Sequence, residues 1–293
     1  MNLINGWIFI NKPSGITSFD VIRNIKKIIN IKKIGHAGTL DPFATGMLGI
    51  ALGEATKTIQ FFSSIKQYEF EIEFGESKDT DDIFGKTTKI TEVIPNIDAI
   101  KNCIPSYIGE INQVPPNFSA VKVQGRRAYN LARKNEKFVL KHKKVNIYGL
   151  ECTKQNSKNR FSFKLDCSSG TYVRALARDM AKDLGSLGFV LNLRRTRLGR
   201  FTEKDLISLE KFKELVHIGD HFDYVHTIQD VLDDIPAVYL DYEIGQKFQN
   251  GLSLDYISNC DFFEPLLILS DLNVLGVGKI NKGKLNPVRV FNK

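Results

Sequence analysis

The sequence is poor in cysteine and has no long apolar run. Its 293 residues include four cysteines, Cys103, Cys152, Cys167 and Cys260, which lie far apart, form no Cys-x-x-Cys pair and have no metal-binding spacing. Such cysteines are typical of reduced thiols in a cytoplasmic protein. The apolar run at 7–10 is too short for a signal peptide, and no segment approaches the roughly 18 apolar residues of a membrane span. We therefore expect a soluble, cytoplasmic protein with no membrane partner.

Metal and dinucleotide motifs are also missing. His217, His221 and His226 lie close together, but Gly219 interrupts the helical spacing and no Glu-x-x-His motif accompanies them. The glycine pair at 276–278 lacks the rest of a dinucleotide-binding fingerprint and the helix that would follow it. The chain contains no internal repeat and no low-complexity segment. The sequence therefore predicts no metal site.

One part of the chain has very little negative charge. The net charge of the whole chain is +8, and residues 101–150 alone contain ten lysines and arginines against two acidic residues, Glu110 and Glu136. The excess in this window equals that of the whole chain. Aromatic and amide side chains such as Phe118 and Gln124 interleave with the basic ones, as on a surface that follows a nucleic-acid backbone. A solvated basic face is the alternative.

Hydrophobic patterns predict both strands and helices. Residues 66–75 give the clearest strand, because Tyr68 and Phe70 alternate with Glu69 and Glu71. Further strands are expected at 7–10, 119–124, 145–152, 161–167 and 189–197. Helices are expected at 97–104, at 127–134, at 173–184 and after Ser18, which would cap a helix with apolar residues up to Ile29.

The order of these elements predicts an α+β fold. Strands and helices follow one another without a regular βαβ alternation, and short turn-rich links join several strands. Near residue 233 the pattern changes to short β segments at 238–240, 266–270, 274–279 and 288–291. We therefore expect two domains, at 1–232 and 233–293.

Residues 35–46 combine three glycines and a proline around one carboxylate. Gly35, Gly38 and Gly46 allow backbone angles that other residues resist. Pro42 restricts both its own φ and the conformation of Asp41. A loop of this composition suits a presented nucleophile or a ligand that approaches the backbone closely. In the simpler alternative, Asp41 accepts hydrogen bonds from nearby backbone N–H groups in a turn.

A catalytic Asp41 needs a cation beside it. An aspartate in a pocket stays ionised only where a positive charge offsets burial, and Arg174 is our candidate. If residues 168–174 are extended, Tyr172 and Arg174 point to the same side and could share a pocket. Alternatively, Tyr172 packs in the core and Arg174 pairs with Asp179 or another surface acid.

Five segments, in this order, resemble the motifs of bacterial TruB-type tRNA pseudouridine synthases. They cover most of residues 1–200: the Asn-Lys-Pro-Ser-Gly segment at 11–18, the glycine loop and its sequel at 35–57, Lys-Gln-Tyr at 66–68, residues 113–122, and Ser-Ser-Gly-Thr-Tyr-Val-Arg at 168–174. Two departures are small, because Gly49 replaces a frequent proline and 79–82 is a looser match. The resemblance implies a pseudouridine synthase catalytic domain with a mixed, largely antiparallel sheet.

The resemblance also implies roles for site residues. It makes Asp41 the nucleophile that isomerises uridine 55 in the T loop, and Arg174 its catalytic partner. It implies substrate contacts from His36, Tyr68, Tyr172 and Leu193: a stacking face for the base at Tyr68, an RNA contact at His36, and a uracil-pocket wall at Leu193. Taken alone, Tyr68 and Leu193 would more often be core residues, and His36 a loop residue that forms hydrogen bonds.

The resemblance implies that two parts of the chain bind RNA. The family has a basic insertion, here at about 122–145, that closes over the T arm of tRNA. Its predicted RNA-binding residues are Lys122, Arg126, Arg127, Lys141, Lys143 and Lys144. Residues 233–293 resemble a PUA domain, a small RNA-binding β-barrel, although residues 234–293 contain six basic and seven acidic residues. A purely structural tail is the alternative.

The implied reaction limits the cofactors and partners. It breaks the bond from C1′ to N1 and rejoins the uracil through C5, so no electrons enter or leave. No cofactor is therefore expected, and a monomer acting on tRNA without a protein partner is the simplest form. Two other functions stay open: a guide-RNA-dependent relative, and a tRNA-binding or RNA-folding protein in which catalysis is secondary.

Overall fold

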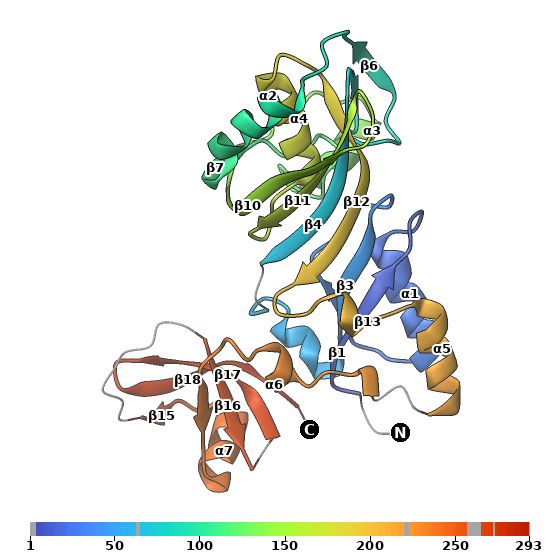
Figure 1. Cartoon of the computed structure of the whole chain (residues 1–293). Coiled ribbons are helices and arrows are strands. Elements are labelled where there is room, and N and C mark those ends of the chain that lie inside the picture. Colours follow the sequence, from blue (N-terminus) through green and yellow to red (C-terminus); the bar gives the residue numbers. More distant parts are fainter. Residues whose placement is uncertain (1–3, 63–64, 220–222, 257–264, 272, 293) are drawn as a thin grey trace.

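The computed structural model describes residues 4–62, 65–219, 223–256, 265–271 and 273–292. A large mixed sheet forms the centre of the molecule, and a smaller sheet near the C-terminus lies at one end of it (Figure 1). Cys260 and His221 lie outside the described residues. The α+β class expected from the sequence is confirmed.

The large sheet has nine strands. Its order is β13-β1-β3-β12-β4-β11-β10-β7, with β2 paired to β3. Only the pairs β1 with β13 and β3 with β12 are parallel, so the sheet is mixed and largely antiparallel, as expected. The strands are β1 (Gly6–Lys12), β2 (Ile34–Ala37), β3 (Thr45–Leu52), β4 (Lys66–Phe74), β7 (Gly109–Gln113), β10 (Lys143–Gln155), β11 (Arg160–Cys167), β12 (Gly188–Leu198) and β13 (Leu206–Ile207).

Helices cover the sheet, and short hairpins extend from it. The α-helices before the C-terminal sheet are α1 (Ser18–Ile29), α2 (Ile97–Cys103), α3 (Ala128–Arg133), α4 (Val173–Asp183), α5 (Leu209–Ile218) and α6 (Ile228–Val231). Short 3-10 turns are η1 (Gly53–Thr58), η2 (Ile104–Tyr107) and η3 (Glu203–Asp205). The hairpins are β5 (Glu76–Lys78) with β6 (Thr87–Ile90), and β8 (Lys122–Val123) with β9 (Arg126–Arg127).

The main core lies between the sheet and helices α1, α4 and α5. The alternation in β4 turns Phe70 and Ile72 into this core, where they meet Leu176 and Met180 of α4. Strand β4 lies between β12 and β11, so it has a hydrogen-bonded neighbour on each side. The strand predicted at 66–75 is therefore confirmed and is central to the sheet.

Two local predictions were wrong. Ser18 does not cap α1, because Thr17 is the N-cap and forms a reciprocal capping box with Asp20. The hydroxyl of Ser18 instead binds the backbone N–H and C=O of Leu40. The strand expected at 119–124 shrinks to the two residues of β8, because this segment pairs only with β9.

The C-terminal sheet has five strands in the order β14-β16-β17-β18-β15. They are β14 (Ala237–Tyr239), β15 (Leu254–Asp255), β16 (Leu266–Ser270), β17 (Asn273–Asn281) and β18 (Lys284–Val290), and helix α7 (Tyr242–Gln249) packs beside them. A second core cluster joins the two sheets, since Trp7 and Phe9 of β1 share it with Leu267 and Phe291. The curled sheet fits the expected PUA-like domain.

Glu54 links the last residues of the chain to the large sheet. Its carboxylate accepts hydrogen bonds from Lys33 Nζ and Lys57 Nζ, each at 2.6 Å, and from the backbone N–H of Asn292 at 2.8 Å. Lys57 Nζ also donates to the carbonyl of Val290 at 2.7 Å. Burial alone would raise the pKa of Glu54, but these hydrogen bonds outweigh burial and lower the pKa to about 2.

The Glu54 network predicts a pH-dependent stability. A carboxyl group with a depressed folded-state pKa stabilises the fold above its unfolded pKa, and this contribution is lost as pH falls toward 2. We expect Glu54→Gln to lower the free energy of unfolding by about 1–3 kcal/mol at pH 7. The loss of stability between pH 4.5 and 2 should also become shallower. Denaturant unfolding at a series of pH values measures both effects.

Glu110→Gln is the matched control for this change. Glu110 pairs with Lys144, and both side chains are exposed, so losing that pair should cost less than about 1 kcal/mol. Equal effects of the two substitutions would show that the Glu54 network does not fasten the end of the chain.

Candidate active site

Asp41 lies in a tightly held loop between β2 and β3. Lys12 is fully buried, and its Nζ donates to the carbonyls of Pro13, Ile16 and Pro42. Gly46 has a φ of +93°, and a Cβ there would overlap the backbone of Arg195. The loop is therefore anchored on both sides of Asp41.

Arg174 holds the carboxylate of Asp41 by two parallel hydrogen bonds. Its Nε donates to Oδ2 and its NH2 group to Oδ1, each at 2.8 Å. The Arg174 side chain is only 4% exposed, whereas that of Asp41 is 29% exposed. A bidentate pair of this kind fixes both the position and the charge of a carboxylate. The pairing expected from the sequence is present, and Asp41 still faces solvent on one side.

Two carboxylates and two carbonyls surround the Arg174 guanidinium. Besides Asp41, it binds Asp82 at 3.3 Å and the carbonyls of Thr80 and Phe118 at 2.9 and 3.2 Å. Burial raises the pKa of Asp82, although Thr80 and Arg174 oppose that shift. Asp179 binds Arg178 rather than Arg174, so the surface-acid alternative is wrong for that residue.

Tyr68 packs against a second buried arginine, Arg195. The phenol oxygen lies 3.4 Å from Arg195 NH1, and the guanidinium carbon is 5.9 Å from the ring centroid. Arg195 is fully buried, and it also donates to the carbonyls of Met47 and Gly38, which flank the Asp41 loop. Burial raises the pKa of Tyr68 despite the nearby Arg195, so its phenol is neutral at pH 7. Arg195 thus joins Tyr68 to the loop.

The backbone around Tyr172 differs from the extended conformation considered above. The segment is not extended through Arg174, because α4 begins at Val173 and Tyr172 is its N-cap residue. The side chain of Gln113 binds both the N–H and the C=O of Tyr172. Burial and the charge of Asp41 raise the pKa of Tyr172, so this half-buried ring lies within the field of Asp41.

His36 and Leu193 complete the residues predicted for the substrate pocket. His36 lies in β2 rather than in the loop, and its buried Nδ1 has no hydrogen-bond partner among the residues that the structure describes. Burial and the charge of Arg195 lower its pKa, so it is neutral at pH 7. Leu193 is buried in the main core with Tyr68. Their roles toward a substrate stay predictions.

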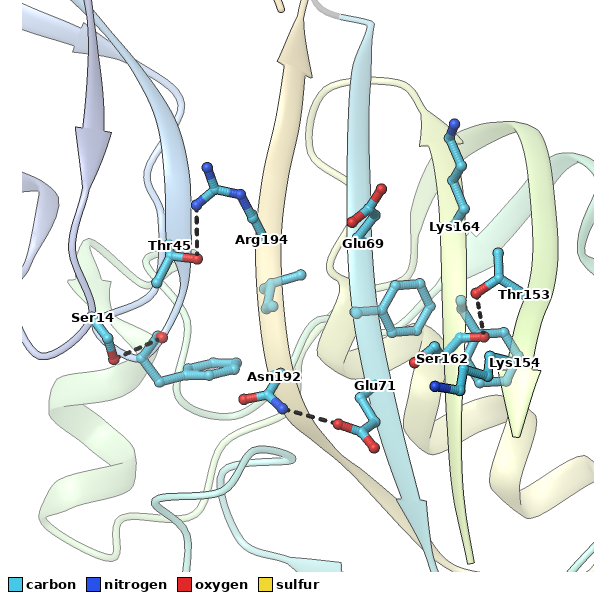
Figure 2. Close-up of a pocket in the computed structure, with 14 residues that line it drawn as sticks. Ser14, Thr45, Glu69, Glu71, Thr153, Lys154, Ser162, Lys164, Asn192 and Arg194 are labelled. Carbon is cyan, nitrogen blue, oxygen red and sulfur yellow. Dashed lines mark hydrogen bonds between the residues drawn. The ribbon is translucent and has the colours of Figure 1, made fainter. Parts of the chain in front are cut away.

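A cavity of about 660 Å³ lies on the face of the large sheet that carries Glu69 and Glu71 (Figure 2). Glu69 and Glu71 line it, and they alternate with Tyr68 along β4. Of the predicted site residues, Leu193 lines this cavity, whereas Asp41, Tyr68 and Arg174 do not. This cavity is therefore not the place where Asp41, Tyr68 and Arg174 come together.

The basic insertion begins beside the Arg174 guanidinium, which binds the carbonyl of Phe118. Two of its predicted RNA-binding residues are engaged within the protein: Arg126 pairs with Glu136, and Lys144 with Glu110. Arg127 donates to a backbone carbonyl. The predicted residues Lys122, Arg126, Arg127, Lys141, Lys143 and Lys144 are all exposed.

His226 has a structural environment. The ring of His226 packs against Phe9 and Phe201, and its backbone pairs with Trp7. Within the described ranges, no group of three or more His, Cys, Asp or Glu side chains could hold a metal ion. No helix in the described part of the chain is long and apolar enough to cross a membrane.

Several residues of the site were missed by sequence reasoning. Asp82, Lys12 and Arg195 were not predicted, although all three contact the Asp41 loop or its partner. Lys12 lay inside a motif segment and Asp82 in the looser match at 79–82, and no other signal pointed to them. Arg195 belongs to an arginine-rich strand, where composition alone does not distinguish a buried guanidinium from exposed ones.

Comparison with known proteins places this site in an enzyme class. A family model described as "TruB family pseudouridylate synthase (N terminal domain)" matches residues 26–173, and one described as "tRNA pseudouridylate synthase B C-terminal domain" matches 174–236. The fold and the site therefore define a pseudouridylate synthase. The chain belongs to the TruB family.

Full-length relatives and solved structures agree with this assignment. tRNA pseudouridine synthase B of Ehrlichia ruminantium (strain Gardel) is 41% identical over 98% of this chain and 99% of its own. The protein of that name from Caulobacter sp. (strain K31) is 39% identical over 98% and 96%. A chain of an H/ACA RNP bound to a substrate RNA containing 2′-deoxyuridine has the same fold, with a TM-score of 0.75, 22% identity and coverage of 99% and 86%. A chain of a Cbf5-Nop10-Gar1 complex also gives 0.75, with 24% identity and coverage of 99% and 84%.

The Arg174 geometry predicts a defect in rate rather than in binding. Arg174→Lys keeps the positive charge but cannot donate two parallel hydrogen bonds to Asp41. We expect single-turnover pseudouridine formation to slow by at least about tenfold, the equivalent of one lost charge-assisted hydrogen bond, while RNA affinity changes little. The measurement uses saturating enzyme, which removes differences in affinity.

Arg178→Lys is the control, because Arg178 binds Asp81 and Asp179 one turn further along α4 and does not touch Asp41. A wild-type rate for Arg174→Lys would mean that the bidentate geometry is irrelevant to the reaction.

Proposed function

We propose that this chain isomerises uridine 55 in the T loop of tRNA to pseudouridine, with Asp41 as the nucleophile. One observation supports the proposal: an anchored loop presents Asp41, and Arg174 orients its carboxylate by two hydrogen bonds while one side stays exposed. The relatives named tRNA pseudouridine synthase B, 39–41% identical over nearly the whole chain, support tRNA as the substrate.

The chemistry of the reaction fits these residues. The bond between C1′ and N1 breaks, the uracil turns, and a bond forms between C1′ and C5. The proton on C5 leaves, N1 gains a proton, and no electrons are exchanged. A carboxylate can assist by attacking C1′ of the ribose or C6 of the base, and either step requires an ionised nucleophile. Arg174 donates two hydrogen bonds to the Asp41 carboxylate and so orients it.

The uridine must leave its stack before Asp41 can reach it. Flipping a nucleotide out costs a few kcal/mol unless the pocket offers stacking in return. We assign that stacking to Tyr68, supported by its position against Arg195 beside the Asp41 loop. His36, Tyr172 and Leu193 would form the rest of the pocket wall around the base.

The remaining parts of the chain would bind the tRNA body. The basic side chains of 122–145 would contact phosphates of the T arm, and residues 233–293 would form a second RNA-binding unit beyond the catalytic unit at 1–232. The protein would act as a cytoplasmic monomer without a protein partner. The contacts between the two sheets through Trp7 and Glu54 suit a tRNA that spans both.

A guide-RNA-dependent function is the second candidate, because chains of H/ACA and Cbf5 complexes share the fold. Their identity to this chain is 22–24%, against 39–41% for the tRNA pseudouridine synthase B relatives, which favours the stand-alone enzyme. An RNA-folding protein with secondary catalysis is the third candidate. Activity on a bare tRNA transcript separates the three.

The direct test incubates the purified chain with an unmodified tRNA transcript and maps pseudouridine at base resolution. We expect conversion of uridine 55 alone, and none with Asp41→Asn, because the amide keeps the shape but is not a nucleophile. The variant should bind tRNA within about tenfold of wild type, since affinity rests on phosphate contacts. Turnover by a mass-verified Asp41→Asn protein would reject the assignment, and dependence on an added guide RNA would favour the second candidate.

Tyr68 offers a separate test of base stacking. Tyr68→Leu removes the ring and should forfeit roughly 1–3 kcal/mol of stacking together with any role of the hydroxyl, whereas Tyr68→Phe removes the hydroxyl alone. We expect Tyr68→Leu to be slower than Tyr68→Phe in single-turnover assays with saturating enzyme. If Tyr68→Leu converts uridine at the wild-type rate, Tyr68 is only a core residue.

A further inference from the structure

Two positive side chains, Lys66 and Arg195, lie beside Gly38 in the Asp41 loop, and a third, Lys143, lies against Gly170. Lys66 begins β4, Lys143 begins β10, and Arg195 lies in β12. A Cβ placed on Gly38 would lie 2.9 Å from Lys66 Nζ and 3.5 Å from Arg195 NH1. A Cβ on Gly170 would overlap the Nζ of Lys143. Both glycines therefore leave room for the lysine ends.

None of these three cations has an acidic partner among the residues that the structure describes. Neither Lys66 nor Lys143 takes part in an ion pair there, and Arg195 donates only to two carbonyls and the Tyr68 hydroxyl. Burial, followed by the charges of Arg195 and Lys143, lowers the pKa of Lys66 to about 8. Cys167 also lies nearby, but burial raises its pKa to about 11, so it is a neutral thiol at pH 7. The cluster holds positive charge that the protein does not balance.

Unbalanced buried charge destabilises a fold. Lys66 is 9% exposed and Arg195 is fully buried, so both have lost most of their hydration. Such destabilising charges are kept where a bound ligand of opposite charge offsets the loss of hydration. Gly38, which lies against both side chains, is three residues from Asp41, so an anion bound by these side chains would lie next to a nucleotide at Asp41.

We propose that Lys66 and Lys143 bind one phosphodiester of the RNA backbone next to the uridine at Asp41. The buried Arg195 adds positive potential at this site. The inference rests on the proposed function and adds a defined phosphate site to it. Lys143 is exposed and can receive the phosphate from solvent, whereas Lys66 is reached only when the RNA enters the pocket. Arg195 is too deeply buried to touch the RNA and keeps its bonds to the loop.

The test removes one charge from the protein and one from the RNA. A T-arm hairpin is made with a single neutral methylphosphonate at each linkage, in turn, from two positions before the target uridine to two after it. Wild-type affinity should fall by about tenfold at one linkage, as for the loss of a charge-assisted contact. Lys66→Met and Lys143→Met should bind the unmodified hairpin about tenfold more weakly and lose sensitivity at that same linkage.

Lys154→Met is the control, since Lys154 is exposed on β10 and lines the cavity on the opposite face. It should keep the wild-type profile of linkages. If the methylphosphonate at each linkage changes the affinity of the Lys66→Met protein as much as that of the wild type, the proposed phosphate site is wrong.

Thermal unfolding separates a ligand role of Lys66 from a structural one. Methionine fills a similar volume without a charge, so Lys66→Met should melt at the same temperature as wild type or higher. A lower melting temperature with unchanged RNA affinity would show that Lys66 only supports the fold. The proposed function fails separately, if the wild-type chain makes no pseudouridine in the same hairpin, whatever its linkage profile.

Discussion

The buried guanidinium of Arg174 is the interaction on which the active site depends. It joins four segments that are far apart in the sequence: the Asp41 loop, the acidic turn with Thr80 and Asp82, the entry to the basic insertion at Phe118, and α4 itself. Arg174 lowers the pKa of Asp82, which burial and the charge of Asp41 raise, so without this cation the pKa of Asp82 would be higher still. The orientation of the Asp41 carboxylate and the placement of the segment at Phe118 therefore depend on the same side chain.

A second set of cations holds the site from the opposite side. Lys12 and Arg195 donate hydrogen bonds to backbone carbonyls around the Asp41 loop and so hold it in place. Tyr68 packs against Arg195. Burying these charges without carboxylates destabilises the chain, and the large shared cores of the two sheets offset that cost. Lys66 belongs to the same unbalanced group. Burial, followed by the charge of Arg195, lowers the pKa of Lys66 to about 8.

Periodicity predicted the parts of the fold that are decided locally. The alternation through Tyr68 predicted β4, and the apolar face and Gly185 predicted the extent of α4, because burial on one side leaves a regular pattern. Ser18 was misjudged as a cap because two hydroxyl residues are adjacent, and tertiary contact with Leu40 decides between them. Asp82 and Arg195 were not found, since their roles arise only from contacts between distant segments. The Asp41 loop stood out by composition, yet the roles of its residues and the boundary near 233 stay predictions.

The central claim is that Asp41 of this chain forms pseudouridine in the T loop of tRNA. The most direct measurement is base-resolution mapping of pseudouridine in total tRNA from cells that lack the protein, complemented with either the wild-type chain or the Asp41→Asn variant. The account predicts that pseudouridine at position 55 disappears from the tRNA pool, returns with the wild-type chain and does not return with the variant. Pseudouridine 55 that persists in the deleted cells, or that the variant restores, would contradict it.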